Sequence, residues 1–90
     1  MKYKLFKTNQ FKKAFKKLRL SDSQEQAFID VVYKLLNGLE LEKKYKNHSL
    51  TGIYSGFREC HLKPDLLLVY KIDDDELKLV DIGSHSTLFD

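Results

Sequence analysis

The apolar residues of this chain change their spacing about midway along it. Between residues 23 and 37 they recur every three or four positions, as they do on one face of a helix. Beyond residue 52 they form short runs separated by Pro64-Asp65 and by Asp73-Asp74-Asp75, a pattern typical of strands joined by tight turns. Helices followed by a strand meander predict an α+β fold, with the helices packed on one face of an antiparallel sheet.

Two helices are expected in the first half of the chain, and together they form a helical hairpin. The first is amphipathic and basic, and Thr8 or Asn9 can cap its start. The second covers about residues 23–37, because Ser23 and Gln26 have the spacing of a capping box before its apolar stripe. We therefore expect the hairpin to bury its apolar face against the sheet.

About four strands are expected, within a single domain of residues 1–90. Residues 38–52 have no clear period and are expected to form a long loop, and a polar turn with an apolar end follows residue 83. The third of the four segments should be central in the sheet, because both its faces are apolar. The strands are expected over residues 2–6, 52–62, 66–72 and 76–82.

Cysteine content, hydrophobic runs and charge predict the cell compartment and the kinds of partner of the protein. Cys60 is the only cysteine, so no intramolecular disulfide can form. No run of about 18 apolar residues is present, which predicts a cytoplasmic protein with no membrane partner. Residues 1–50 hold 12 Lys and Arg against 5 Asp and Glu, whereas residues 51–90 hold 4 against 8. The positive half can attract phosphates or an acidic protein, although a solvated helix face rich in lysine gives the same pattern.

Three histidines are the main candidates for chemistry, because this side chain both accepts and donates protons near neutral pH. Strand alternation places Glu59 and His61 on the same face, with Arg58 on the other. His85 follows the last strand, so strand pairing can bring it to the same end of the sheet as His61. His48 lies in the long loop, where a purely structural role would look the same in sequence.

Two chemistries are compatible with dispersed histidines and a nearby carboxylate. The tight spacings of zinc ligands, such as His-x-x-x-His or Cys-x-x-Cys, do not occur, so we expect no metal and no other cofactor. Metal-free acid–base catalysis needs one group that accepts a proton and another that donates one to the same substrate. RNA is such a substrate, because its 2′-OH attacks the adjacent phosphate once it is deprotonated.

Four segments of the second half resemble one known family in order and spacing. They are YKNHSLTG at residues 45–52, GFRECHLKPD at 56–65, VYK at 69–71 and GSHSTLF at 83–89. These segments closely resemble the YafQ-like branch of the RelE/ParE toxin superfamily, and the basic helical hairpin agrees with its RelE-like fold. The resemblance implies the toxin of a type II toxin–antitoxin system, a ribosome-dependent endoribonuclease that cuts translated mRNA and is neutralised by a cognate antitoxin.

The resemblance also implies roles for individual residues. His48, His61, Asp65 and His85 match positions implicated in catalysis, and Phe89 matches a position implicated in substrate binding. One of the catalytic residues is expected to help remove the 2′-OH proton, and another to protonate the 5′-oxygen, with His85 our first choice for proton transfer. Which residue is base and which is acid stays open.

The chain departs from the family pattern at two positions. Family members commonly carry a basic residue two positions before the Gly of the Gly-Ser-His segment, where this chain has Asp81. Lys46 or Lys63 is expected to supply the missing phosphate contact, since Arg58 lies on the wrong face. An aromatic residue found in some relatives after the Pro-Asp pair is Leu66 here, which leaves base stacking to Phe89 or Tyr45.

Partners and alternative functions follow from the same resemblance. The expected partners are the cognate antitoxin, the ribosome with its mRNA, and operator DNA indirectly through the antitoxin complex. The alternative, favoured by Asp81, is a toxin or inactive relative that binds a protein such as gyrase without cutting RNA. A plain RNA-binding module is the third possibility.

Overall fold

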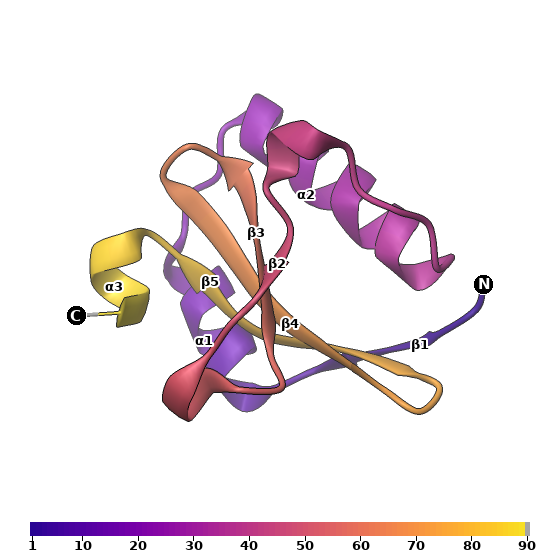
Figure 1. Cartoon of the computed structure of the whole chain (residues 1–90). Helices are drawn as coiled ribbons and strands as arrows, with labels where there is room; N and C mark the ends of the chain where they lie inside the picture. Colours follow the sequence, from indigo (N-terminus) through magenta and orange to yellow (C-terminus); the bar gives the residue numbers. More distant parts are fainter. Residues whose placement is uncertain (90) are drawn as a thin grey trace.

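Two helices lie against one face of a five-stranded sheet in this computed structural model, which describes residues 1–89 (Figure 1). Asp90, the last residue of the predicted domain, lies outside the described residues. The helices are α1 (Asn9–Lys17), α2 (Asp22–Leu36) and the short α3 (His85–Phe89). The strands are β1 (Lys4–Lys7), β2 (His48–Ser49), β3 (Arg58–Lys63), β4 (Leu66–Asp73) and β5 (Glu76–Gly83). The turns η1 (Lys43–Tyr45) and η2 (Gly52–Tyr54) complete the elements.

The helical hairpin begins with two side-chain caps. Thr8, one of the two expected caps, accepts a hydrogen bond at Oγ1 from the Phe11 amide and donates one to the Val80 carbonyl, which ties α1 to β5. The capping box of α2 is formed by Ser21 and Gln24, so the predicted pair was wrong by two positions. The earlier start brings acidic residues into the first turn, where the helix dipole favours them.

The sheet has the order β1-β5-β4-β3-β2, with β4 central as predicted. All neighbours pair antiparallel except β1 and β5, which run parallel. The core lies between the helices and one face of the sheet, which burial of apolar side chains stabilises. It is built from Phe11, Val31 and Leu35 of the helices and from Cys60, Leu62, Leu68, Tyr70, Leu77 and Leu79 of the strands.

The structure corrects three expectations for the second half of the chain. His48 lies in the edge strand β2 and not in a loop; a strand of two polar residues has no hydrophobic period that sequence could reveal. The predicted strand over residues 52–62 begins only at Arg58, because Gly52 and Gly56 have φ values of 67° and 96° that interrupt an extended chain. The tail forms α3 and not a polar turn with an apolar end.

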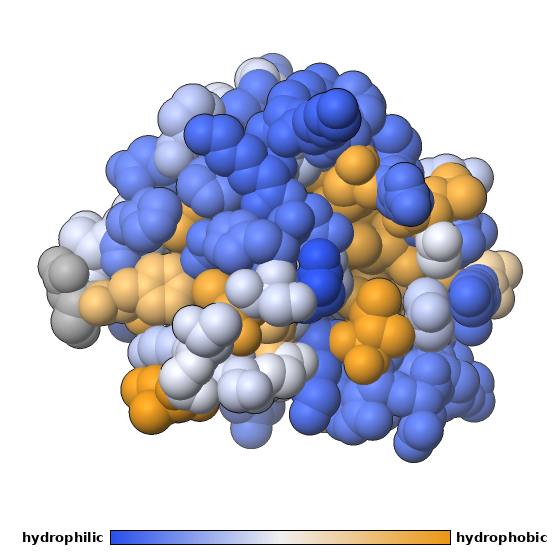
Figure 2. Space-filling model, in the orientation of Figure 1, coloured by the Kyte–Doolittle hydropathy of each residue, from blue (hydrophilic) through white to orange (hydrophobic). Residues whose placement is uncertain are grey.

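The face of the sheet opposite α1 and α2 carries Glu59 and His61. It is polar at its surface, and hydrophilic side chains gather over β2 and β3 (Figure 2). Within residues 1–89, no helix combines the length and the apolar character that crossing a membrane requires.

Candidate active site

The carboxylate of Glu59 lies between two histidines on the outer face of β3. Its Oε1 is 3.5 Å from Nε2 of His48 and 3.5 Å from Nε2 of His61. His48 reaches it from the neighbouring strand, since β2 and β3 pair His48 directly with Glu59. His61 reaches it along β3, where residues two apart share a face. We call Glu59, His48, His61 and His85 the histidine cluster.

The third histidine of the cluster comes from α3. The ring centroids of His61 and His85 are 5.8 Å apart, and those of His85 and Phe89 are 6.0 Å apart. Phe89 is in turn held edge-on by Tyr54 of η2, at 5.4 Å. Segments far apart in sequence therefore meet at one end of the sheet, as strand pairing predicted for His61 and His85.

Burial divides the cluster into an inner and an outer part. The side chain of Glu59 is 4% exposed, whereas those of His61 and His48 are 17% and 49% exposed. Within residues 1–89, Oε2 of Glu59 has no hydrogen-bond partner, and an unpartnered buried carboxylate oxygen is costly. Glu59 was absent from the predicted site residues, although its position two residues before His61 was the signal that could have found it.

The backbone of the preceding turn fixes which nitrogen of His48 carries hydrogen. Lys46 adopts a left-handed conformation with φ 47°, and its carbonyl oxygen lies 2.8 Å from Nδ1 of His48. A carbonyl oxygen can only accept, so Nδ1 donates and Nε2 is the nitrogen that faces Glu59. The ring is thereby oriented toward the cluster, because the second nitrogen sets the role of the first.

A second group of polar side chains holds β2 from the helix side of the sheet. Asn47 accepts hydrogen bonds at Oδ1 from the Tyr70 hydroxyl, at 2.7 Å, and from Nε of Arg58, at 3.3 Å. Arg58 also donates to Oγ of Ser49, at 2.7 Å. Burial is the main cause that raises the pKa of Tyr70 above its ordinary value, so its hydroxyl keeps its proton. Arg58 is thus used to anchor β2, on the face opposite His61 as predicted.

The other predicted site residues lie around the cluster. Asp65 is exposed in the turn after β3, and no ion pair or side-chain hydrogen bond within residues 1–89 joins it to the histidines. Lys46 is exposed after η1, while Lys63 ends β3 and is not in a loop. Tyr45 is only 6% exposed in the core, which leaves Phe89 as the aromatic ring available for stacking.

Asp81, the residue that departs from the family pattern, is engaged by the protein itself. Its Oδ2 accepts a hydrogen bond from Nε2 of Gln10, at 2.6 Å, and its Oδ1 accepts one from the Ile82 amide. The side chain therefore links β5 to α1. Among residues 1–89, no group of three or more His, Cys, Asp or Glu side chains has an arrangement that could hold a metal ion.

Comparison with known proteins settles the family. The model of the family described as "Bacterial toxin of type II toxin-antitoxin system, YafQ" matches residues 3–90. The chain belongs to the YafQ family. The predicted family and its RelE-like α+β fold are thus confirmed, with five strands in place of about four.

Three known proteins show how close the likeness is in sequence and in structure. The mRNA interferase toxin YafQ of Escherichia coli K12 is 42% identical over 53 residues, which are 59% of this chain and 58% of that protein. The chain thus matches less than two thirds of that relative's length. The copper-bound L66S mutant toxin of Helicobacter pylori has a TM-score of 0.88 at 41% identity, over 97% of this chain and 99% of the other. YafQ in the DinJ–YafQ complex of E. coli has a TM-score of 0.85 at 31% identity, over 98% and 99%.

Proposed function

We propose that this protein is the toxin of a type II toxin–antitoxin pair and that it cleaves translated mRNA on the ribosome without a metal ion. Membership of the YafQ family supports this activity, and the E. coli K12 relative is an mRNA interferase. The observation that carries the proposal is the histidine cluster itself. Two imidazoles share one buried carboxylate, and a third lies beside them on an exposed helix.

The cluster supplies the two proton transfers that RNA cleavage needs. In the proposed reaction, His61, backed by Glu59, accepts the proton of the 2′-OH, and the 2′-oxygen forms a bond to the adjacent phosphorus. The bond from phosphorus to the 5′-oxygen breaks, and His85 donates the proton that the leaving oxygen takes. The products are a 2′,3′-cyclic phosphate and a free 5′-OH.

His48 and Asp65 take supporting places in this proposal. His48 hydrogen-bonds through Nδ1 to the Lys46 carbonyl and turns Nε2 toward Glu59, so in this proposal its half-exposed ring positions Glu59 for its contact with His61. Asp65 is exposed in the turn after β3 and is a second candidate for the same proton transfers as His61.

Contacts to the substrate are assigned to Phe89, Lys46 and Lys63. Phe89 is half-buried, and Tyr54 holds its ring edge-on, so one face can stack on a base. Lys46 and Lys63 supply positive charge for the phosphates. The chain needs this charge because the position where family members commonly carry a basic residue holds Asp81, which is hydrogen-bonded to α1.

A cognate antitoxin is the proposed partner, as DinJ is for E. coli YafQ. An acidic segment of it would cover the positive half of the chain, and the complex would bind operator DNA through the antitoxin. The proposed site of action is the cytoplasm, where translated mRNA is found.

The test is primer extension on mRNA from cells induced for the wild type, for His85→Ala and for Ser86→Ala, an exposed neighbour on α3 that serves as the control. We expect codon-phased cuts in the wild type and the control and none in His85→Ala. In a parallel assay with purified ribosomes in magnesium buffer, toxin that was first stripped of bound metal with EDTA and dialysed should cut as well as untreated toxin. Ribosome-independent cutting, or loss of cutting by the stripped toxin, would contradict the corresponding part of the proposal.

Asp81 favours one alternative, a toxin that binds a protein such as gyrase and leaves RNA intact, because no positive charge stands at this position. That alternative expects growth arrest by the wild type without mRNA cuts, together with inhibited DNA supercoiling. Normal supercoiling in arrested cells would exclude it.

A further inference from the structure

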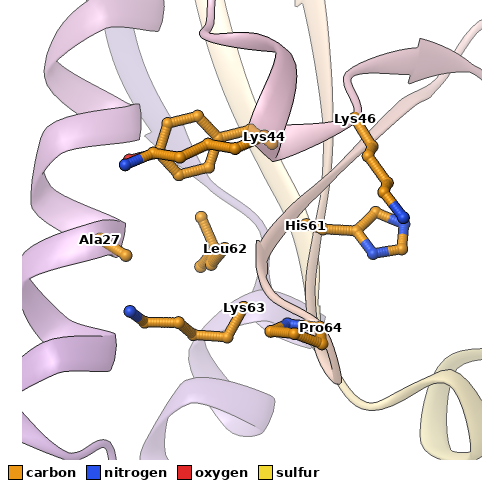
Figure 3. A pocket seen from close by; sticks show the side chains of 8 residues that line it. Ala27, Lys44, Lys46, His61, Leu62, Lys63 and Pro64 are labelled. Atoms are coloured by element: carbon orange, nitrogen blue, oxygen red, sulfur yellow. The ribbon is translucent and has the colours of Figure 1, made fainter.

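A cavity of about 380 Å³ opens beside the histidine cluster, between α2 and the end of β3 (Figure 3). Ala27 and Leu62 line its apolar part, and His61 lines it at the edge nearest the cluster, with its ring turned away from Ala27 and Leu62. Figure 3 shows Lys44 and Lys63 on either side of Ala27 and Leu62, with both ammonium groups turned toward α2. Lys46 also lines the cavity, on the side of His61.

A β-bulge in β3 aims Lys63 into this cavity. The register with β4 shifts between His61 and Lys63, so that Lys63 pairs with Leu66 and not with a residue of the outer face. Leu66 is a core residue, and directly paired side chains share a face, which places Lys63 on the helix side next to Leu62. With regular alternation, Lys63 would share the outer face with His61. The bulge therefore re-aims one side chain, as bulges beside active sites often do.

Two of the three lysines that line the cavity have no acidic partner among residues 1–89. None of the side chains that line it is acidic. Within residues 1–89, neither Lys46 nor Lys63 has a carboxylate within ion-pair distance, and Lys44 lies 3.9 Å from Glu42 and 5.2 Å from the centre of the Tyr45 ring. Three ammonium groups around a partly apolar cavity favour a ligand that combines negative charge with a flat apolar body.

We infer that this cavity binds one nucleotide of the RNA strand next to the cleaved bond. Its base would lie against Ala27 and Leu62, and the phosphates on its two sides would contact the ammonium groups of Lys44 and Lys63, with Lys46 available to the strand beside His61. The position of His61 at the edge of the cavity favours RNA over an acidic protein, because a strand cut at the cluster must continue past this edge. The volume lies in the range of about 300–1,000 Å³ that is usual for small-molecule pockets. The inference rests on the proposed function and adds Lys44 and the bulge to it.

The first experiment measures binding without cleavage. A 2′-O-methyl trinucleotide cannot be cut, so its affinity for the purified protein is measured by NMR titration whether or not the protein is a nuclease. The variant is Lys44→Ala/Lys63→Ala, and Lys4→Ala is the control because Lys4 is 80% exposed and paired with Asp75. We expect the double variant to bind roughly 10-fold more weakly and to lose about 1.4 from the slope of log affinity against log salt. The control should match the wild type.

The second experiment separates binding from chemistry. Single-turnover cleavage by the double variant should show a raised KM with kcat nearly unchanged, because only binding common to substrate and transition state is lost. Lys44→Arg/Lys63→Arg keeps both charges and should bind the trinucleotide within about twofold of the wild type. If binding by the folded alanine variant equals that of the wild type, the inference is overturned. It is also overturned if inorganic phosphate competes as well as the trinucleotide, or if only an acidic peptide binds.

Discussion

At the scale of single residues, Glu59 combines a cost to folding with a proposed role in catalysis. Glu59→Gln keeps the shape of the side chain and removes a buried charge whose Oε2 has no partner. We expect the free energy of unfolding to stay the same or to rise by about 1 kcal/mol. We expect RNA cleavage to fall roughly 100-fold, because His61 loses the negative charge that stabilises its protonated form. Urea unfolding and single-turnover cleavage measure the two effects.

The control for this prediction is Glu76→Gln, the same chemical change at the far end of β5, where Glu76 lies 3.9 Å from Lys78. It should leave cleavage unchanged. A Glu59→Gln protein that is as active as the wild type would remove Glu59 from the mechanism, whatever its stability.

The buried thiol of Cys60 should make the native state less stable at alkaline pH. Burial, with the neighbouring Glu59 charge adding to it, raises the pKa of the Cys60 thiol from 9.0 to about 12. Between these values the unfolded chain loses the thiol proton and the native state keeps it. The free energy of unfolding should therefore fall as pH rises from 9.0 toward about 12, by at most about 1.4 kcal/mol per pH unit. Below pH 9.0 the thiol is mostly protonated in both the native and the unfolded state, so it adds little to the pH dependence of the free energy of unfolding.

Urea unfolding of the wild type and of Cys60→Ala, at about pH 8 and about pH 10.5, tests the Cys60 prediction. The alanine variant is expected to lose less stability between the two conditions, because it lacks the thiol and because, besides burial, the Cys60 charge is also one of the causes that raise the pKa of Tyr70. Equal losses would mean that the thiol titrates normally in the native state.

At the scale of elements, the position of α3 depends on the close contact between Gly83, at the end of β5, and Thr87. A Cβ added at Gly83 would lie 2.5 Å from Oγ1 of Thr87, which is too close for an ordinary contact. Gly83→Ala should therefore shift α3 and with it His85, and slow cleavage roughly 10- to 100-fold. Gly83→Ala/Thr87→Ala removes the conflicting oxygen and should recover most of the rate. Cleavage kinetics measure this, and a double variant as slow as the single one would contradict it.

The same scale shows what local sequence patterns can and cannot predict. The apolar stripe of α2 and the runs of β4 and β5 each have a period long enough to identify the element. β2 has only two residues, and it forms because Asn47 is held by Tyr70 and Arg58, contacts between segments that no local pattern contains. For the same reason His48 could be placed at the site only by family resemblance, and Glu59 was missed as its partner.

At the scale of the whole molecule, strand parity predicted which side chains share a face but not the order of the strands. The strands that pair with β3 determine which residues lie beside Glu59. The bulge before Lys63 places this side chain on the helix side of the sheet, whereas regular alternation predicts the outer face. The uneven charge of the two halves was visible in sequence. That Asp81 bonds to Gln10 of α1 required the packing of α1 beside β5.

The parallel pairing of β1 with β5 determines when, during synthesis, the chain can complete its fold. Lys4 pairs with Glu76, so β1 has no partner until β5 has been synthesised. Such distant pairing is slow to form, and His85 is made after β5. Under the proposed activity, a growing chain therefore cannot yet act on the ribosome that makes it. Synthesis itself provides a delay during which a neutralising partner, if translated first, is already present when the toxin folds.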